Sequence, residues 1–353
     1  MDELKSVTEY LRATVEMGGS DLHLSSGAPP AARIDGIIKP LEDFCLSDEA
    51  TKQLIHDTLT ESQRAELEDE WELDFAIEIN GVGRFRGNAH FIHGHIEASF
   101  RHIPSDIPDI TSLGHYPVIE QICQKRHGLI LLTGVTGSGK STTLASLVKR
   151  ISETRSGVII TVEDPIEFVY PHLSCLVKQR EIGTDTKSFP RALRQALRQD
   201  PDVIVVSELR DLETIRIALT AAETGHLVIA TLHTVDAPQS IDRLVDVFPP
   251  DQQQQIIAQL ANVLQSVVSQ RLLARPDGPG RVMASEVMLM NHGIRNCIRE
   301  RKIEQLVGLM EIGQGEGMHT IDESLTHLLQ TKQITLQEVL HNCRDNKRFE
   351  SPT

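Results

Sequence analysis

Three carboxylates lie within five positions in the segment EDPIEF, in which Glu163, Asp164 and Glu167 follow the apolar run GVIITV. Carboxylates at the end of a strand can orient a water molecule for attack or hold a metal ion. The same composition also suits a solvated turn. Pro165 restricts the backbone directly after the run and would keep Glu167 in one place. The segment alone therefore indicates only an acidic turn, and its chemistry depends on its neighbours in the chain.

The segment GVTGSGKS, residues 134–141, contains the whole phosphate-binding pattern G-x-x-x-x-G-K-[ST]. It follows the strand-like GLILLT and opens a helical pattern, and this context makes a chance glycine-rich turn the weaker interpretation. In such a loop, backbone amides surround the phosphates, Lys140 reaches the β- and γ-phosphates, and Ser141 ligates Mg²⁺. We predict an ATP and Mg²⁺ site that uses Gly134, Thr136, Gly137, Ser138, Gly139, Lys140, Ser141 and Thr142.

Two segments further along the chain carry polar residues beside apolar runs. DVIVVSE ends at Glu208, a carboxylate that would hold the metal directly or through water. AETGHLVIATLHT carries His226 and His233 around an apolar run. A single histidine beside such a run is usually structural, but two of them favour a sensor of the γ-phosphate. Because parallel strands gather their ligand site at their carboxyl ends, we expect the EDPIEF carboxylates to face the same crevice as Lys140.

The elements that would position these residues fall into two domains. The first reads as mixed α/β, with strands such as ELDFAIEI and two helices that begin at the caps Ser47 and Thr60. In the second, continuous apolar strands alternate with helices, which is typical of a parallel sheet covered on both faces. The tail from Asp251 onward is expected to be mostly helical, with one strand-like insertion, RVMASEVMLM. The proline-containing segment PSDIPDITSLGHYP separates the domains, and we predict the ranges 1–104, 105–117 for the linker, and 118–353.

Composition limits the class of protein. A hydrophobic content of 40% and a charged content of 24% are those of an ordinary soluble protein. The sequence has no apolar run long enough to span a membrane, and MDELKSVTEY lacks the apolar core of a secretory signal. The five cysteines form no CxxC pair, so we expect neither a zinc ribbon nor a disulfide framework. Reduced cysteines and the lack of a signal lead us to expect a cytoplasmic location. The net charge of −15 argues against a broad nucleic-acid surface.

Arginines are the remaining candidates for the site. Motors with a phosphate-binding loop can complete their site with an arginine from a neighbouring subunit. Arg84, Arg86 and Arg101 are candidates in the first domain, because each lies at a strand position without a local acidic partner. The second domain offers competitors: Arg191, Arg194, Arg198 and Arg210. Residue types and spacing do not choose among them.

Taken together, these segments resemble the PilT-type pilus retraction ATPases of the secretion ATPase superfamily, over nearly the whole chain. The resemblance lies in GGSDLHLSSGAPP, GVTGSGKSTTLASLV, TVEDPIEF, QREIGTDTKSF, ALRQDPDVIVVSELRDLETIRIALTAAETGHLVIATLHT and IDRLVDVFP. It implies a PAS-like first domain, a RecA-like second domain and a hexameric ring. ATP would bind between the two domains, with arginines of a neighbouring subunit completing the site.

The resemblance also implies a role for each candidate. Glu167 would be the general base and Glu208 would act at the metal, with Glu163 and Asp164 shaping the water network. His226 and His233 match the family's His box. Arg84 and Arg101 lie on strands where the family places arginines that act on a neighbouring subunit, and which of them acts stays open.

One element is characteristic of retraction ATPases. HGIRNCIRE, residues 292–300, is similar to the family's AIRNLIRE, and its Ile294, Cys297 and Ile298 form an apolar helical stripe. Two departures stand out. Ser207 lies where the family usually has glycine, and His292, Gly293 and Cys297 replace the usual residues of the retraction element.

The function implied by the resemblance is an ATP-hydrolysing ring that docks on an inner-membrane pilus platform and drives pilus retraction and twitching motility, with other pilus ATPases as further partners. A related pilus-assembly or secretion ATPase is the alternative. A nucleic-acid motor is less favoured because of the acidic charge, and a regulator without turnover is less favoured because Lys140, Glu167 and Glu208 are all present.

Overall fold

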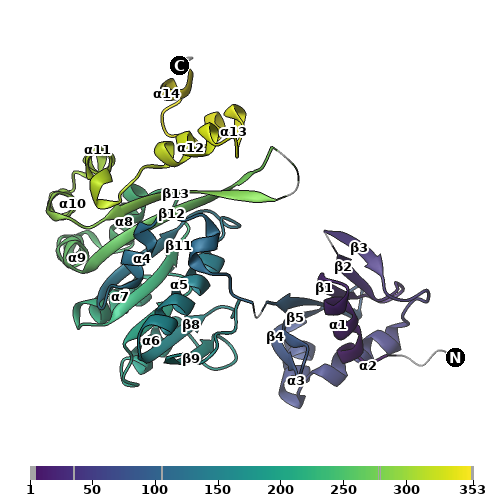
Figure 1. The fold of residues 1–353 in the computed structure, drawn as a ribbon. Helices are drawn as coiled ribbons and strands as arrows, with labels where there is room; N and C mark the ends of the chain where they lie inside the picture. Colours follow the sequence, from purple (N-terminus) through teal and green to yellow (C-terminus); the bar gives the residue numbers. More distant parts are fainter. Residues whose placement is uncertain (1–4, 35, 105, 277, 279, 351–353) are drawn as a thin grey trace. The chain divides into compact units, whose positions relative to one another are not determined.

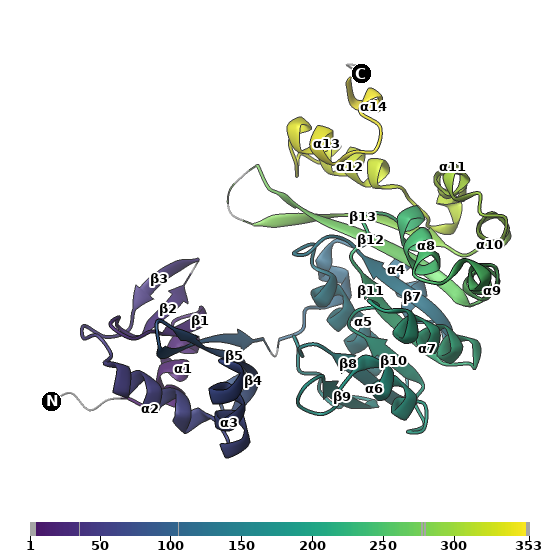
Figure 2. The same cartoon turned by 180° about the vertical axis from the view of Figure 1, so that it is seen from behind.

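The computed structural model describes residues 5–34, 36–104, 106–276, 278 and 280–350. Ser105 of the predicted linker therefore lies outside the described residues. By their contacts the residues form two compact units, each mixed α/β (Figures 1 and 2). The first unit is Met1–Asp106 with Glu167–Val169, and the second is Ile107–Ile166 with Tyr170–Thr353.

The first unit is an antiparallel sheet with three helices, α1 (Val7–Glu16), α2 (Asp48–Thr58) and α3 (Glu61–Glu70). Its strands are β1 (Gly19–Leu24), β2 (Ala31–Ile34), β3 (Ile37–Pro40), β4 (Glu72–Ile79), β5 (Gly83–Ile92) and β6 (His95–Ile103), in the order β3-β2-β1-β6-β5-β4. The predicted caps are confirmed: Ser47 accepts a hydrogen bond from the amide of Ala50, and Thr60 accepts one from the amide of Gln63. The sheet buries alternate residues, among them Phe85 and Phe100, in a core that also contains Leu11 and Ile55 of the helices.

The second unit is built on a seven-stranded sheet in the order β13-β12-β7-β11-β10-β8-β9. Its strands are β7 (Gly128–Thr133), β8 (Gly157–Glu163), β9 (Cys175–Glu181), β10 (Val203–Val206), β11 (Leu227–Leu232), β12 (Leu264–Ala274) and β13 (Arg281–Leu289). All neighbouring pairs are parallel except β12 with β13, which confirms the predicted parallel sheet. The expectation that the tail contains one strand was wrong. β12, LQSVVSQRLLA, contains polar residues at irregular spacing, and its strand form depends on pairing with β7 and β13.

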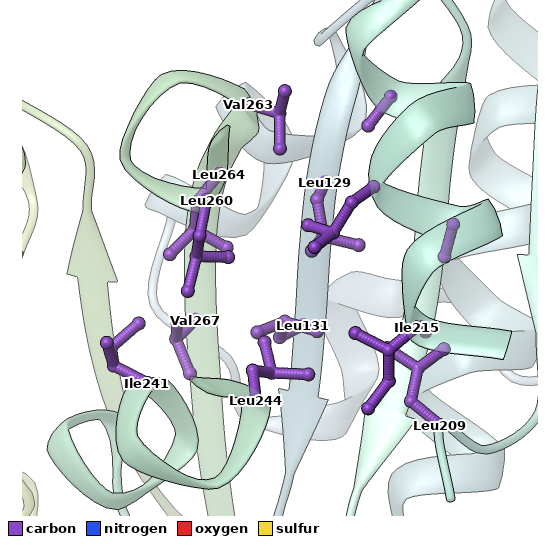
Figure 3. Close-up of a cluster of buried hydrophobic side chains, with 14 of the residues drawn as sticks. Leu129, Leu131, Leu209, Ile215, Ile241, Leu244, Leu260, Val263, Leu264 and Val267 are labelled. Carbon is purple, nitrogen blue, oxygen red and sulfur yellow. The ribbon is translucent and has the colours of Figure 1, made fainter. Parts of the chain in front are cut away.

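Helices cover both faces of this sheet. One face packs on α6 (Phe189–Ala196), α7 (Leu212–Glu223), α8 (Ala237–Asp246), α9 (Pro250–Val263), α10 (His292–Arg299) and α11 (Leu306–Ile312). Leu129 and Leu131 of β7 point into this core beside Leu244 and Leu260, whereas the equally buried Ile130 and Leu132 do not belong to it (Figure 3). Because successive strand residues face opposite sides, Ile130 and Leu132 face the side of α4 (Val118–Cys123) and α5 (Lys140–Thr154). β7, the strand before the phosphate-binding loop, is therefore buried on both faces.

The C-terminal part of the second unit lies beyond β13. It contains α12 (Ile321–Gln330), α13 (Leu336–Asn342) and the short α14 (Lys347–Glu350), and α12 packs against β13 (Figures 1 and 2). Ile321, Leu325 and Val339 form a small core with Leu273 of β12 and Ala284 of β13. Among the described residues, no helix is both long and apolar enough to cross a lipid bilayer.

The segment that leads into the second unit is attached to α5. Ile107 and Ile110 are buried, and Ile110–Leu113 forms a short 3₁₀ helix. Lys149 donates a hydrogen bond to the carbonyl of Ile107 at 2.7 Å, and Ser146 donates one to the carbonyl of Pro108 at 2.8 Å. Within the predicted linker, residues from Ile107 onward are thus packed on the second unit.

A buried histidine makes the stability of the second unit depend on pH. His319 is 5% exposed, stacks on Tyr116 with 3.9 Å between ring centroids, and its Nε2 lies 3.1 Å from Ser285 Oγ. Burial lowers its pKa to about 4, so the unfolded chain takes up a proton from about pH 6.5 downward, before the folded chain does. The contribution of neutral His319 to the unfolding free energy is therefore fully present above about pH 6.5 and is lost as the pH falls toward 4.

We expect His319→Gln to flatten this dependence. Between pH 7.5 and 5.0, wild type should lose roughly 2 kcal/mol more unfolding free energy than the variant does. Urea denaturation at the two pH values measures this difference, and exposed His341→Gln is the matched control. Equal pH dependence of wild type and His319→Gln would contradict the assignment, whatever their absolute stabilities.

Candidate nucleotide-binding and hydrolysis site

The phosphate-binding loop Gly134–Gly139 connects β7 to the first turn of α5. Gly134 has φ of 145°, and a Cβ atom at this position would lie 2.4 Å from the carbonyl oxygen of Gln270, so only glycine fits. Lys140, the first residue of α5, is 8% exposed and folds back over the loop. Its Nζ donates to the carbonyl of Gly134 at 2.7 Å and to that of Val135 at 3.0 Å. The ammonium group and the amides at the helix N-terminus thus lie beside one loop, an arrangement that attracts phosphate.

A pocket of about 510 Å³ lies against this loop. Its walls are Gly134–Ser138 on one side and, on the other, Gln270, Arg271, Leu272 and Arg281 of the β12–β13 hairpin, with Val235 and Asn342. Gln270 Nε2 donates to the carbonyl of Ser138 at 2.8 Å, and Arg281 donates to the carbonyl of Gly137 at 3.2 Å. The sequence pattern does not single out the hairpin residues. Gln270 is one of several polar residues of β12, and only the fold shows that it is 1% exposed and therefore needs a hydrogen-bond partner.

Glu208 and His233 come together at the carboxyl ends of the neighbouring parallel strands β10 and β11. His233 Nε2 lies 3.3 Å from Glu208 Oε2, and Arg210 Nη2 lies 2.8 Å from the same oxygen. Burial raises the pKa of Glu208, but the hydrogen bond from Arg210 and the charges of His233 and Arg210 outweigh it, so the pKa lies below its ordinary value. Glu208 is therefore ionised at neutral pH, as a metal-binding carboxylate must be.

The three carboxylates of EDPIEF differ in their surroundings. Glu163 is 4% exposed at the end of β8, where it accepts hydrogen bonds from Thr161 Oγ1 at 2.6 Å and Gln179 Nε2 at 3.0 Å. Asp164 and Glu167 are exposed. β8 lies three strand positions from β7, which places its end about 14 Å from the start of the phosphate-binding loop. Glu163 thus shares an edge of the sheet with Lys140 but is not next to it.

His226 lies at the other end of β11 from His233. It directly precedes the strand, and its Nδ1 lies 3.1 Å from the carbonyl oxygen of Ala221, at the end of α7. Because β11 runs parallel to β7, its amino end is at the opposite edge of the sheet from the loop. Within the second unit, the structure therefore brings His233, and not His226, to the edge that carries Glu208.

The arginine candidates of the first unit share one face of its sheet. Arg86 of β5 pairs in register with Arg101 of β6, and Arg84 is two residues from Arg86 on the same side. Two of them have acidic partners that are distant in the sequence. Arg101 binds Asp21 at 2.8 Å and Arg86 binds Asp74 at 3.3 Å, because antiparallel pairing brings these carboxylates across from neighbouring strands.

Of the two departures from the family pattern, Ser207 directly follows β10, and the changed residues of the retraction element lie in α10. The backbone amide of Ser207 donates to the carbonyl of Val162 at 2.9 Å, and its carbonyl accepts a hydrogen bond from Thr231. HGIRNCIRE contains the helix α10, and the predicted stripe is confirmed because Ile294, Cys297 and Ile298 are buried.

Two side chains near the carboxyl edge of this sheet have donor groups of the type that suits a magnesium ion. Ser141 on α5 and Glu208 are oxygen donors, the ligand type that Mg²⁺ prefers. No cluster of three or more histidine, cysteine, aspartate or glutamate residues that could hold a metal exists in the part of the chain that the structure describes. A magnesium ion here would therefore take most of its ligands from nucleotide phosphates and water, as is usual for Mg²⁺.

Comparison with known proteins identifies the family. Residues 109–302 match the family model of type II/IV secretion system proteins. The chain is 44% identical to the type IV pilus retraction ATPase PilT of Pseudomonas aeruginosa, covering 97% of this chain and 99% of that protein. It is 38% identical to the type IV pilus ATPase PilU of the same organism, covering 94% and 87%. A crystal structure of the pilus retraction motor PilT with bound ADP matches with a TM-score of 0.92 and 46% identity over 98% of both chains. The chain is therefore an ATPase of the type II/IV secretion system family and belongs to its PilT-type group of pilus retraction ATPases.

Proposed function

We propose that this protein is the ATP-hydrolysing motor of type IV pilus retraction, which powers twitching motility. The observation that carries the proposal is the likeness in sequence and fold to PilT over nearly the entire length of both chains. The lysine and glycines of the loop and the Glu208–His233 pair are all present, as hydrolysis requires.

Each side chain has a proposed task. Lys140 exchanges the carbonyls of Gly134 and Val135 for oxygens of the β- and γ-phosphates, and the loop amides bind the remaining oxygens. Ser141 and Glu208 would hold Mg²⁺, which neutralises the charge that develops on the phosphates. His233 reports on the γ-phosphate through Glu208. Glu167 accepts the proton of the attacking water.

The assembly around this site is also a proposal. A homohexameric ring would bring Arg84 or Arg101 of one subunit to the nucleotide of its neighbour. The segment 105–117 would separate a PAS-like domain, 1–104, from the RecA-like ATPase domain, 118–353. Its packing on α5 from Ile107 onward favours a hinge on the amino-terminal side of Ile107. The ring would work in the cytoplasm at the inner-membrane pilus base, on the platform protein and alongside other pilus ATPases.

Complementation tests this function. In a strain that has lost pilus retraction, wild type should restore twitching, and Glu208→Ala should not, because the carboxylate that holds the metal is gone. Glu153→Ala, an exposed glutamate on α5, is the matched control and should restore twitching. Immunoblots must show equal amounts of the three proteins. Restored twitching by Glu208→Ala would contradict the proposed mechanism.

A nucleic-acid motor is the functional alternative from a different class. It predicts that DNA stimulates phosphate release in a steady-state assay, and the net charge of −15 opposes it. Loss of twitching in Glu208→Ala together with the absence of DNA stimulation would separate the two functions.

A further inference from the structure

A short segment near the C-terminus, Asn342–Arg344, is attached to the nucleotide site at two places. The carbonyl of Asn342 accepts a hydrogen bond from Arg271, and both residues line the pocket beside the phosphate-binding loop. The Arg344 side chain is 28% exposed, and its Nη2 lies 3.1 Å from Glu286 and 3.3 Å from Asp236. The segment thus contacts both the pocket and the loop that follows β11.

The backbone of this segment is fixed independently. The amides of Arg344 and Asp345 donate to the two carboxylate oxygens of Asp322, at 2.7 and 3.0 Å. Asp322 is 7% exposed in the first turn of α12, which packs on β13. Arg344 is therefore presented toward Asp236 and Glu286 from a rigid support.

Asp236 and Glu286 hold the loop that carries His233. Asp236 is the N-cap of α8 and accepts the amide of Gln239 at 2.8 Å. Glu286 of β13 accepts the amide of Ala237 at 3.0 Å. The loop from His233 to Ala237 is consequently anchored at its far end by two carboxylates, and Arg344 bridges both of them.

The ion pairs of Arg344 with Asp236 and Glu286 compensate the charge of two neighbouring carboxylates. Glu286 is 1% exposed, and a buried carboxylate that loses its cationic partner is strongly unfavourable. Without Arg344, Glu286 would either stay ionised and repel Asp236 or, because burial raises its pKa, take up a proton and hold the amide of Ala237 less strongly. Either change would loosen the end of the loop, and with it the imidazole that lies 3.3 Å from Glu208.

We propose that Arg344 is a positioning residue for ATP hydrolysis, which holds the loop His233–Ala237 through Asp236 and Glu286 and so sets the contact of His233 with Glu208. This inference rests on the proposed role of His233 and Glu208 in hydrolysis. It gives the C-terminal segment a task in the turnover of the motor, although Arg344 itself does not touch the reacting groups.

A mutant cycle on the full-length protein tests the inference. Arg344→Gln should lower kcat about 10- to 100-fold, because a small misplacement of a catalytic group has effects of this size. Affinity for ADP, measured by calorimetry, should stay within about twofold, because the loop Gly134–Gly139 and Lys140 are untouched. In a His233→Ala background, Arg344→Gln should cause less than about twofold further loss. Arg348→Ala, an exposed arginine in the same tail, should leave all these values unchanged.

Asp322→Asn provides a second route to the same answer should Arg344→Gln fail to fold. Its amide group has one acceptor oxygen instead of two, so it cannot hold the backbone amides of both Arg344 and Asp345, and the loss of this support for Arg344 should reproduce the loss of kcat. Wild-type kcat in either variant, or independent and multiplicative losses with His233→Ala, would overturn the inference. Wild-type kcat in His233→Ala alone would instead contradict the proposed site, so the two failures can be told apart.

Discussion

Replacement of Glu167 by glutamine is expected to lower the rate of ATP hydrolysis by about 10²–10⁴-fold while ATP binding persists. The amide cannot accept the proton of the attacking water, but it has the size and exposure of the carboxylate. The phosphate-binding groups, Lys140 and the loop amides, are unaffected. A phosphate-release assay gives the rate, and binding of fluorescent ATP gives the affinity.

Two further variants make the result specific to Glu167. Glu66→Gln, an exposed glutamate of α3, should retain the wild-type rate. Glu163→Gln should have a smaller effect than Glu167→Gln, because Glu163 is buried and already accepts hydrogen bonds from Thr161 and Gln179. Wild-type turnover in Glu167→Gln would assign the base to Glu163 or Glu208 instead.

Loss of the arginine that acts on a neighbouring subunit is expected to lower kcat by about 10³–10⁵-fold, at least as much as Glu167→Gln does. Either Arg84→Ala or Arg101→Ala should show it, and Arg86→Ala, on the same face of the sheet, is the matched control. The ion pair of Arg101 with Asp21 does not oppose such a role. The Arg101 side chain is 73% exposed, so it can turn from Asp21 toward a phosphate. Asp21 is 7% exposed, and it would keep the hydrogen bond from Ser20 at 2.7 Å and the ion pair with Arg33 at 3.9 Å.

Mixing of subunits tests whether the arginine acts between subunits. An inactive arginine variant and inactive Glu167→Gln, mixed in equal amounts, should regain activity at about a quarter of the sites, those that combine an intact base with an intact neighbouring arginine. The recovered rate must depend on subunit exchange. If the mixture stays inactive although subunits exchange, both groups belong to one subunit and the proposal for that arginine is wrong.

Much of the nucleotide site could be predicted because its parts are local in the sequence. The phosphate-binding loop depends on glycines at fixed offsets between a strand and a helix, and the structure has β7, the loop and α5 in this order. Helix caps such as Ser47 and the apolar stripe of α10 are equally local, since each involves residues a few positions apart.

The missed features depend on residues that are far apart in the chain. The sequence of β12 does not distinguish strand from helix, and its strand form depends on pairing with β7 and β13. The acidic partner of Arg101 was missed because Asp21 reaches it only through the register of β1 and β6. His226 and His233 looked equivalent in sequence, and only the direction of β11 separates them.

The sequence by itself thus determined the family, the phosphate-binding loop and the candidate carboxylates and histidines, because these are encoded in short spacings that one strand, turn or helix enforces. The tertiary structure decided which of them meet. Strand order puts Glu208 and His233 within 3.3 Å, and the C-terminal segment brings Arg344 to Asp236 and Glu286. These contacts depend on how buried strands and helices pack, which residue spacing along the chain does not specify.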